Sequence, residues 1–528
     1  MSDVQPVLID GQWRAADQVG TFAPDNPATK APTGETYPVS SLADVEAALQ
    51  AGARAAEALL SVPAAQIAQF LERYADRIEA RRDDLTQMAN AESGLPVEPR
   101  LDGIELPRTT DQLRQAAAAA RDGSWALPTI DTAAGIRSVY GSLEGAVAVF
   151  GPNNFPFAFN SVAGGDFAAA IAAGNPVIGK GNSSHPGTTR LLAEEALEAV
   201  KETGLPTAMV QLIYRTDHAT GEKLVSHPLI GATGYTGSRG AGLVLKGAAD
   251  RAGKPIYMEL SSINPVYILP GALAERGAEL VDEFATSCLM GTGQFCTNPG
   301  IVVLLKGAPA DEFVAQTSAK FGGAPVGTLL SGAVEKSMDQ SVAALQAAGA
   351  QVLVGGQAGG GNGYSYNNTL LQVDGSRFLD DPEALQEEAF GNESLLVMAD
   401  DADQAVAIAR SFEGNLTGAL YSDTQGGDDA LYDQIAPILR RKVGRLLNDK
   451  MPTGVAVSAA MNHGGPYPAT GHPGFTAVGI PGSLLRFAML QSFDNVRPHR
   501  LPASLQDQNP GGTWRLIDGA WSQASVES

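Results

Sequence analysis

The sequence has very little cysteine: among its 528 residues there are only Cys288 and Cys296. They lie eight positions apart on one expected helix-to-turn segment, which is a poor geometry for a disulfide bond. A disulfide-stabilised secreted domain is therefore excluded, and a reducing cytoplasm is the expected compartment. Two cysteines are too few for a sulfur-rich metal cage, and the six histidines show no i, i+4 pairing, so we expect no metal.

Long apolar runs and an excess of positive charge are also missing. No stretch reaches the roughly 18 apolar residues of a membrane helix, and residues 1–6 carry no basic patch before an apolar core. The 58 acidic residues outnumber the 36 basic ones and give a formal net charge of −22. This charge would repel phosphate backbones and anionic lipid. We therefore expect no export, no membrane insertion and no nucleic-acid partner.

The chain is long enough for two or three globular domains, and 44% of its residues are hydrophobic. From Ser41 to Ala91 the apolar spacing predicts two long amphipathic helices, with Ser41 and Asp44 as a capping pair and Gly94 ending the second helix. Between about 145 and 260, strand candidates alternate with helical segments, which is typical of βαβ units around a parallel sheet. They are Ala146–Phe150, Val177–Lys180, Met209–Ile213, Gly231–Tyr235 and Ile256–Leu260.

A second α/β region is expected from about 260 to 485. Its strand candidates are Ile301–Leu305, Leu395–Met398 and Gly418–Tyr421. The segment Ile136–Tyr140 and the tail after Gln491 fit neither region, and we interpret them as arms that pair with another subunit.

Cys296 lies in a turn of small residues, Gly291–Gly300. Such a turn exposes backbone N–H groups, whose dipoles favour a thiolate and could stabilise an oxyanion on its adduct. A cytosolic cysteine is more often a small core residue, and this is our interpretation of Cys288. For Cys296 we favour a nucleophile because of the residues that accompany it.

Two further side chains suit a cysteine nucleophile. Asn154, in the turn after the strand Ala146–Phe150, could donate its amide to the oxyanion, although an asparagine there more often serves the turn itself. Glu259 ends an apolar strand. Facing a cysteine pocket it could deprotonate thiol or water, whereas an isolated glutamate there is usually solvated.

Together, Asn154-Phe155-Pro156, Glu259-Leu260-Ser261-Ser262 and Gly293-Gln294-Phe295-Cys296 resemble, in order and separation, the motifs of the NAD(P)-dependent aldehyde dehydrogenase superfamily. Lys180, the run Tyr235–Ser238 and the run Glu387–Gly391 match places that this family uses for its cofactor. The motifs differ from the residues common in the family at Asn153, Ser261-Ser262 and Asn392. These differences leave the catalytic residues unchanged.

The resemblance implies an α/β fold with two parallel-sheet domains, a Rossmann-like cofactor domain and a catalytic domain, plus a β oligomerisation arm. The expected bounds are 1–128 with 145–258 for the NAD(P)-binding domain, 259–485 for the catalytic domain, and 129–144 with 486–528 for the arm and tail. A homodimer or homotetramer is implied as well.

The resemblance also implies roles. Cys296 would attack the aldehyde, Asn154 and the Cys296 backbone N–H would hold the oxyanion, and hydride would pass to the nicotinamide. Water activated by Glu259 would then hydrolyse the thioester. The cofactor residues implied are Lys180 at the adenosine ribose, Gly237, Ser238 and Gly242 at the pyrophosphate turn, and Glu388 with Phe390 at the nicotinamide ribose.

Ser183 is the informative departure from the family pattern. Many NAD-preferring members carry there a glutamate that binds the ribose hydroxyls, and a carboxylate would repel a 2′-phosphate whereas a hydroxyl does not. Arg215 is placed to reach the same phosphate, with a solvated surface arginine as an equal alternative. NADP is therefore the preferred cofactor and NAD the alternative.

The stretches Gly444–Val455 and Met461–Thr470 resemble the branch that contains 2-oxoglutarate semialdehyde (2,5-dioxopentanoate) dehydrogenases and broad NADP-linked fatty aldehyde dehydrogenases. The expected reaction is oxidation of that semialdehyde to 2-oxoglutarate, and an aliphatic aldehyde is the alternative substrate. An acidic substrate would need a cation near the tunnel mouth; the candidates are Arg100, Arg108 and Arg114, although surface ion pairs with Glu105 or Asp111 are the more common arrangement. Other residues expected near the substrate are Phe155, Phe295, Thr297 and His463. For His463, a packed or hydrogen-bonded side chain without contact to the substrate is the simpler interpretation.

Four alternative hypotheses for the function fit the sequence less well. A glyceraldehyde-phosphate-type dehydrogenase would need a Gly-x-Gly-x-x-Gly turn in residues 1–40, and a serine hydrolase would need glycine in place of Thr236. A coenzyme-A-acylating enzyme would use the same cysteine, but retention of Glu259 favours hydrolysis. A non-catalytic binding protein with this fold is disfavoured because Cys296, Glu259 and Asn154 are all present.

Overall fold

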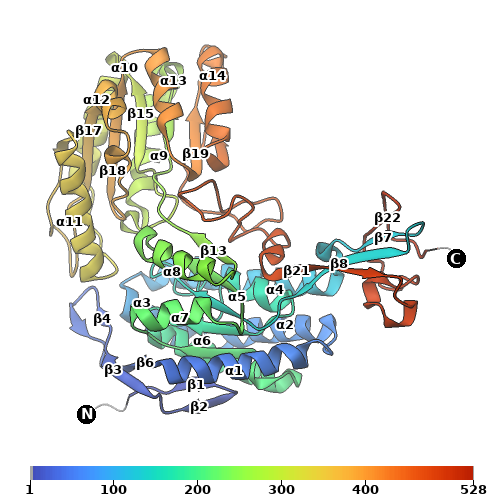
Figure 1. Cartoon of the computed structure of the whole chain (residues 1–528). Coiled ribbons are helices and arrows are strands. Elements are labelled where there is room, and N and C mark those ends of the chain that lie inside the picture. Colours follow the sequence, from blue (N-terminus) through green and yellow to red (C-terminus); the bar gives the residue numbers. More distant parts are fainter. Residues whose placement is uncertain (1–3, 527–528) are drawn as a thin grey trace.

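The computed structural model describes residues 4–526 and arranges them as two α/β lobes with a β arm that projects from one side (Figure 1). Each lobe is built on a seven-stranded sheet, and the arm carries a five-stranded sheet. The predicted fold class is confirmed. Within the described residues, no helix combines the length and the apolar character needed to cross a membrane.

The first sheet has the strand order β13-β12-β9-β10-β11-β1-β2. The five strands from β13 to β11 in this order run parallel to one another. The five strands predicted between 145 and 260 are confirmed to within two residues at each end. The sequence did not predict β1 and β2, because three-residue strands are too short to show a periodicity. The bounds are β1 (Val7–Ile9), β2 (Gln12–Arg14), β9 (Ala146–Phe150), β10 (Val177–Lys180), β11 (Val210–Ile213), β12 (Ile230–Thr236) and β13 (Ile256–Glu259).

The helices of this lobe begin with the segment predicted from Ser41 onward. The Ser41 side chain accepts hydrogen bonds from the backbone N–H groups of Ala43 and Asp44 and so caps α1. The segment holds three helices rather than the two expected, because Arg81 separates α2 from α3, and Gly94, at φ 68°, ends α3. The bounds are α1 (Leu42–Leu59), α2 (Ala64–Ala80), α3 (Arg82–Ser93), α4 (Leu106–Asp122), α5 (Gly165–Ala172), α6 (Pro186–Thr203), α7 (His218–Ser226) and α8 (Arg239–Arg251).

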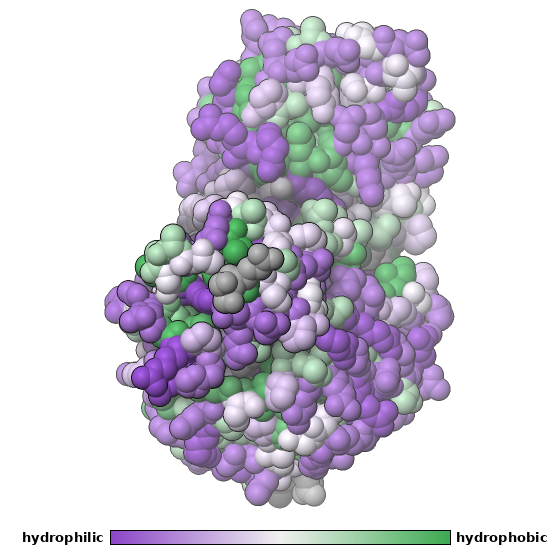
Figure 2. Space-filling view, turned by 90° about the vertical axis from the view of Figure 1, so that its right-hand side faces the viewer, coloured by the Kyte–Doolittle hydropathy of each residue, from purple (hydrophilic) through white to green (hydrophobic). Residues whose placement is uncertain are grey.

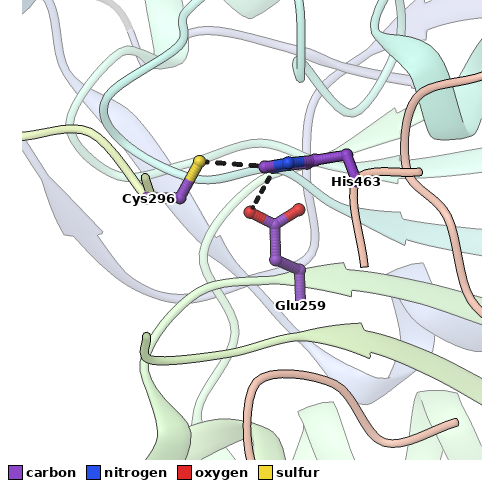
Figure 3. A group of neighbouring side chains, drawn as sticks. All are labelled: Glu259, Cys296 and His463. Atoms are coloured by element: carbon purple, nitrogen blue, oxygen red, sulfur yellow. Dashed lines mark hydrogen bonds and ion pairs between the residues drawn. The ribbon is translucent and has the colours of Figure 1, made fainter. Parts of the chain in front are cut away.

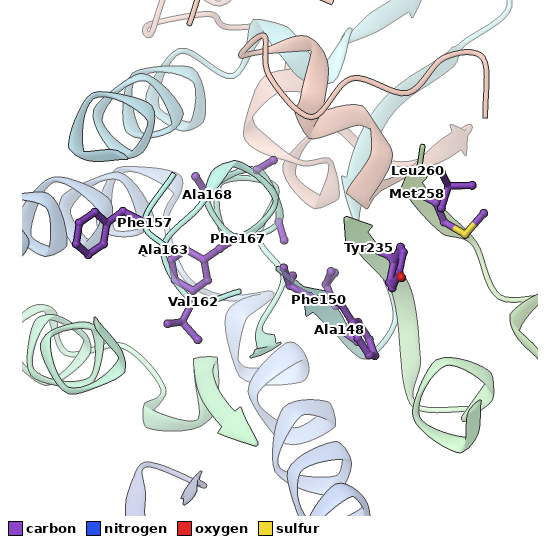
Figure 4. Packing of buried hydrophobic residues seen from close by; sticks show 14 of the residues in the cluster. Ala148, Phe150, Phe157, Val162, Ala163, Phe167, Ala168, Tyr235, Met258 and Leu260 are labelled. Atoms are coloured by element: carbon purple, nitrogen blue, oxygen red, sulfur yellow. The ribbon is translucent and has the colours of Figure 1, made fainter. Parts of the chain in front are cut away.

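The core of this lobe lies directly beneath three strand ends that carry candidate site residues. Figure 4 shows Phe150 of β9 and Tyr235 of β12 in this cluster, with Phe167 of α5 nearby. The strand register pairs Tyr235 with Phe150 and Thr236 with Glu259, so β9, β12 and β13 end at one edge of the sheet. In a parallel sheet this carboxyl edge is where ligands bind.

The second sheet has the order β16-β17-β18-β15-β14-β19-β20, in which only β16 is antiparallel to its neighbour. Its three predicted strands are confirmed, two of them longer at one or both ends than expected. The strands are β14 (Val266–Ile268), β15 (Ile301–Leu305), β16 (Gln351–Val354), β17 (Thr369–Asp374), β18 (Glu393–Ala399), β19 (Asn415–Tyr421) and β20 (Val443–Asn448). The helices are α9 (Pro270–Leu289), α10 (Ala308–Gly323), α11 (Gly332–Ala347), α12 (Gly375–Asp380), α13 (Ala402–Ser411) and α14 (Asp429–Arg440).

The arm joins the two segments that fitted neither lobe. β8 and β21 pair antiparallel along their whole length, from Ser142 with Ala488 to Ile136 with Asp494. On the face seen in Figure 2, hydrophilic residues predominate and hydrophobic ones form small separate patches. Pairing of the arm with another subunit stays a prediction. The arm strands are β7 (Thr129–Asp131), β8 (Ile136–Ser142), β21 (Ala488–Asp494), β22 (Arg515–Ile517) and β23 (Ala520–Ser522); two small hairpin sheets use β3 (Gln18–Phe22) with β6 (Tyr37–Ser40) and β4 (Asp25–Asn26) with β5 (Ala31–Pro32).

Candidate active site

Three reactive side chains from distant parts of the chain meet between the two lobes (Figure 3). Glu259 ends β13, Cys296 lies in the loop between α9 and β15, and His463 belongs to the irregular segment after β20. His463 Nε2 lies 3.3 Å from Cys296 Sγ and 2.9 Å from Glu259 Oε1. Glu259 and His463 are each only 2% exposed, so the contacts form out of bulk water.

His463 was expected only near the substrate or packed in the core, and the structure places it between the thiol and the carboxylate. More than 160 residues separate it from Cys296 in sequence, since the two positions differ by 167. No local spacing pattern reports such a contact. The only sequence signal was the pair of glycines that follows it, which predicts a turn but no partner.

A glycine and an asparagine set the position of the Cys296 loop. Gly293 has φ 68°, and a Cβ there would lie 2.0 Å from the backbone oxygen of Gly391, so only glycine fits. The Asn264 amide nitrogen lies 2.9 Å from the backbone oxygens of both Cys296 and Asn298. Sequence reasoning did not single out Asn264, because its role depends on a loop 32 residues away.

The local environment keeps the thiol protonated. Burial raises the pKa of Cys296 well above its usual range, the Glu259 carboxylate raises it further, and Arg108 acts weakly in the opposite direction. Burial thus acts against the N–H dipoles, which were expected to favour the thiolate. Glu259 Oε2 is buried and without a hydrogen-bond partner among residues 4–526, so this oxygen is free to accept a proton.

Cys288 has the opposite character, as the sequence analysis expected. It lies in the last turn of α9, fully buried in the apolar core of the second lobe. Burial raises the pKa of its thiol, and the neighbouring Glu393 raises it further. It is a structural residue.

Asn154 follows β9 and is 5% exposed. Its Nδ2 donates to the backbone oxygen of Gln294, 2.9 Å away, and its own backbone oxygen accepts from Arg100. The amide is thus held against the chain two residues before Cys296. Its second N–H is the group that would serve an oxyanion.

The three candidate arginines have different surroundings. Arg100 forms a buried ion pair with Glu105, and Arg114 forms half-exposed ion pairs with Glu79 and Asp76. Arg100 also lies over the ring of Phe155, 4.5 Å from its centroid. Arg108 lies 5.7 and 5.3 Å from the ring centroids of Phe155 and Phe159.

Of the three, Arg108 has no ion pair with a described carboxylate, and like Arg100, whose Nε is also unbonded, it buries a donor without a partner. Its Nε donates to Gln112, whereas its Nη2 is buried and has no hydrogen-bond partner in the described part of the chain. Burial lowers its pKa, and the nearby Glu105, Cys296 and Glu259 counteract that effect. A buried guanidinium nitrogen without a partner is costly unless a ligand completes it.

Aromatic and aliphatic side chains pack beside the thiol. The rings of Phe155 and Phe295 meet edge to face at 5.5 Å, and Phe159 lies 5.9 Å from the His463 ring. The Thr297 hydroxyl accepts from the backbone N–H of Gly454, so it anchors the neighbouring loop. The cluster also includes Ala158, Phe475, Ala477, Val478, Val455, Val457 and Met461.

Glu388 and Phe390 line a small pocket together with Phe295 of the Cys296 loop. Burial raises the pKa of Glu388 to about 7, although hydrogen bonds from Ser261 and Ser262 act to lower it. This carboxyl therefore changes charge near neutral pH.

A third group of residues lies at the carboxyl edge of the first sheet. Lys180 ends β10 and Arg215 follows β11, and the register pairs Lys180 with Ile213. Burial and the charge of Arg215 lower the pKa of Lys180 to about 8. Ser183 follows in the same loop as Lys180 and is partly buried.

The first turn of α8 completes this edge. Ser238 stands at its N-cap, but its side chain makes no capping hydrogen bond. Gly237 packs against Tyr235, and a Cβ on Gly242 would lie 2.5 Å from Leu260 Cδ2, so the helix sits close to the sheet. A helix N-terminus with uncommitted N–H groups suits a phosphate group.

Comparison with known proteins agrees with this architecture. Residues 13–436 match the model of the aldehyde dehydrogenase family. The chain belongs to the aldehyde dehydrogenase family. It is an NAD(P)-dependent oxidoreductase that acts on the aldehyde group.

Two curated relatives align over nearly the whole chain. Alpha-ketoglutaric semialdehyde dehydrogenase 2 of Azospirillum brasilense is 38% identical, covering 97% of this chain and 98% of the relative. Alpha-ketoglutaric semialdehyde dehydrogenase of Acinetobacter baylyi is 36% identical, covering 98% of each. Among solved structures, lactaldehyde dehydrogenase from Escherichia coli superposes with a TM-score of 0.80 at 22% identity, over 93% of this chain and 99% of that one. That last likeness shows the fold.

Proposed function

We propose that this enzyme oxidises 2-oxoglutarate semialdehyde (2,5-dioxopentanoate) to 2-oxoglutarate. The main structural support for this substrate is Arg108, whose buried Nη2 lacks a hydrogen-bond partner among residues 4–526. A guanidinium offers a fork of donors that matches a carboxylate, and the substrate bears one at the end remote from the aldehyde. The names of the two curated relatives support the same substrate.

The reaction begins with loss of the Cys296 proton to Glu259, directly or through His463, which contacts both. The sulfur then attacks the carbonyl carbon, and the Asn154 amide with the Cys296 backbone N–H donates to the developing oxyanion. A bound nicotinamide cofactor supplies the hydride acceptor. Glu259 passes the first proton to solvent and then takes a proton from water, which attacks the thioester carbonyl; the acid leaves, and the departing thiolate of Cys296 regains a proton.

NADP is the proposed preferred cofactor, with NAD as the alternative. Lys180 and Arg215 place two cations at one edge of the sheet, and position 183 is a serine rather than an acid. Two cations without a facing carboxylate favour a 2′-phosphate. Ser238 and Gly237, with Gly242 behind them, would hold the pyrophosphate, and Glu388 beside Phe390 the nicotinamide ribose.

An aliphatic aldehyde is the second candidate substrate. The packed cluster of Phe155, Phe159, Phe475 and Met461 beside the thiol is apolar. Such a surface would accept a hydrocarbon chain, but a hydrocarbon chain offers no hydrogen-bond acceptor to the buried guanidinium of Arg108.

The proposed assembly is a homodimer or a homotetramer joined through the arm. Met489 and Leu490 of β21 and Trp521 of β23 are about half-exposed in the single chain, and their burial against a second copy would stabilise such an assembly. The domain limits given in the sequence analysis and a cytoplasmic location form part of the same proposal; the two unpaired thiols suit a reducing compartment.

The test is production of reduced cofactor by purified protein supplied with 2-oxoglutarate semialdehyde or a medium-chain aliphatic aldehyde, each with NADP and with NAD. We expect the highest kcat/KM for the semialdehyde with NADP, and loss of activity by at least about 10⁴-fold in Cys296→Ala. Equal efficiency with both cofactors would refute the NADP preference. A higher kcat/KM for the aliphatic aldehyde would favour the second candidate.

A further inference from the structure

We propose that Glu259, Cys296 and His463 form a binding site for one zinc ion, and that zinc is a reversible inhibitor of this enzyme. The inhibition rests on the proposed catalytic role of Cys296; the binding does not. Each of the three residues offers a ligand atom, and these atoms all lie within 4.8 Å of one another.

The distances fit the coordination sphere of zinc. Tetrahedral zinc holds sulfur at about 2.3 Å and nitrogen or oxygen at about 2.0–2.2 Å, so its ligand atoms lie roughly 3.3–3.7 Å apart. The separation of Cys296 Sγ and His463 Nε2 is 3.3 Å, and that of His463 Nε2 and Glu259 Oε1 is 2.9 Å. Entry of zinc requires these two separations to widen by a few tenths of an ångström, while the third pair, Cys296 Sγ and the Glu259 carboxylate, starts within 4.8 Å.

The ligand chemistry is equally suitable. Thiolate, imidazole and carboxylate are the three side-chain ligands that zinc takes, and three protein ligands leave a fourth position for water. The second oxygen of Glu259, Oε2, is buried and without a hydrogen-bond partner in the described part of the chain. That buried, uncommitted acceptor is an independent sign that the site can take a cation.

The three ligands are held in place by separate contacts. Asn264 fixes the backbone of Cys296. The backbone of His463 is bonded on both sides, its N–H to the hydroxyl of Thr476 and its oxygen to the N–H of Ala477. A site that is already assembled loses little conformational entropy when the ion binds.

Charge also balances on binding. Zinc binds sulfur as the thiolate, so the thiol proton goes to solvent as the Zn–S bond forms, and any proton on His463 Nε2 leaves as well. Thiolate and carboxylate then offset the two positive charges of the ion. No electron is transferred, and the thiolate held by zinc can no longer attack an aldehyde.

Binding is tested without reference to activity. Calorimetric titration of the full-length protein with zinc chloride, in a buffer without thiols, should give one ion per chain. A parallel titration with Co²⁺ should give a sulfur-to-metal charge-transfer band. Cys296→Ala should abolish that band, and Cys296→Ala and His463→Ala should each weaken zinc binding by at least about 100-fold, because even the loss of a group outside the ligand sphere costs about 10–100-fold.

His472→Ala is the matched control, because His472 is exposed nine positions along the same segment and should leave zinc binding unchanged. Glu259→Gln retains an oxygen but not its charge, and should lie between the control and the other variants. Equal weak binding by all variants, as expected of scattered surface carboxylates on a chain of charge −22, would overturn the site.

The inhibition has its own readout. Zinc should inhibit the wild-type enzyme, and a chelator should restore the activity fully. Inhibition that is as strong in Glu259→Gln, measured on its residual activity, would mean simple capture of the thiol and would refute the three-ligand site. A protein that binds zinc as described but oxidises no aldehyde would refute the proposed function while leaving the site intact.

Discussion

The two sides of the Cys296 loop differ in how completely the protein has arranged them. On the reaction side, Glu259, His463 and Asn154 are buried and already bonded to each other or to the loop. On the cofactor side, Arg215 is exposed and the nearby Lys180 has its pKa lowered, with no described carboxylate acting on it in the opposite direction. The protein thus preorganises its acid–base groups, and leaves charges for the ligand to neutralise.

The difference predicts the largest loss for the reaction side. Glu259→Gln keeps the size of the side chain but removes its basicity, so kcat should fall by about 10²–10⁴-fold, the usual contribution of a general base. Steady-state production of reduced cofactor measures this effect. The half-exposed Glu413, paired with Arg239, gives the control Glu413→Gln; equal losses in the two variants would contradict a special role for Glu259.

Asn154→Ala should follow, with a fall in kcat of about 10²–10³-fold, the cost of removing one oxyanion donor. Because Asn154 also holds the backbone oxygen of Gln294, part of the loss could come from a displaced loop. Thermal unfolding of the variant and of Asn153→Ala, its less buried neighbour, separates the two causes. A loss of activity that merely follows a loss of stability would refute the oxyanion role.

Much of this arrangement was predictable, and the missing parts have a physical reason. Strand ends such as Phe150 and Glu259 follow from local apolar patterns, and a parallel sheet brings such ends to one edge. The contact of His463 with both Cys296 and Glu259, and the hold of Asn264 on the Cys296 loop, depend on tertiary packing that no local pattern encodes.

The effect of burial on the pKa of Cys296 could not be predicted from the sequence for the same reason. The sequence shows the glycines that free backbone N–H groups, but it does not show how deeply the folded chain buries the sulfur. Nor does it show which of Arg100, Arg108 and Arg114 lacks an acidic partner; the structure singles out Arg108.

Substitution of Arg108 tests whether its charge binds the substrate carboxylate, because the charge should then matter for the semialdehyde and not for an aliphatic aldehyde. Arg108→Gln should lower kcat/KM for the semialdehyde by about 10–100-fold, as expected for a charged hydrogen bond of about 1.5–3 kcal/mol. An aliphatic aldehyde should be little affected. Arg114→Gln, which breaks only half-exposed ion pairs, is the control, and equal losses with both substrates would remove the assignment of Arg108 to the carboxylate.

The smallest effect belongs to the cofactor side and depends on pH. The pKa of Lys180 is lowered to about 8, so the side chain is charged below that pH and neutral above it. Since the neutral amine no longer attracts a 2′-phosphate, kcat/KM for NADP should fall as pH rises through about 8. Arg215 keeps its charge, so the fall should be limited to about fivefold, the size of one partly exposed ion pair.

The control for this pH effect is the same measurement with NAD. NAD lacks the 2′-phosphate, so its kcat/KM should show no such fall, and the ratio of the two efficiencies cancels any titration of Cys296 or Glu388 that both reactions share. Lys180→Met should flatten the ratio across pH 7–9. A ratio that still falls near pH 8 in Lys180→Met would assign the titration to another group and remove Lys180 from the phosphate site.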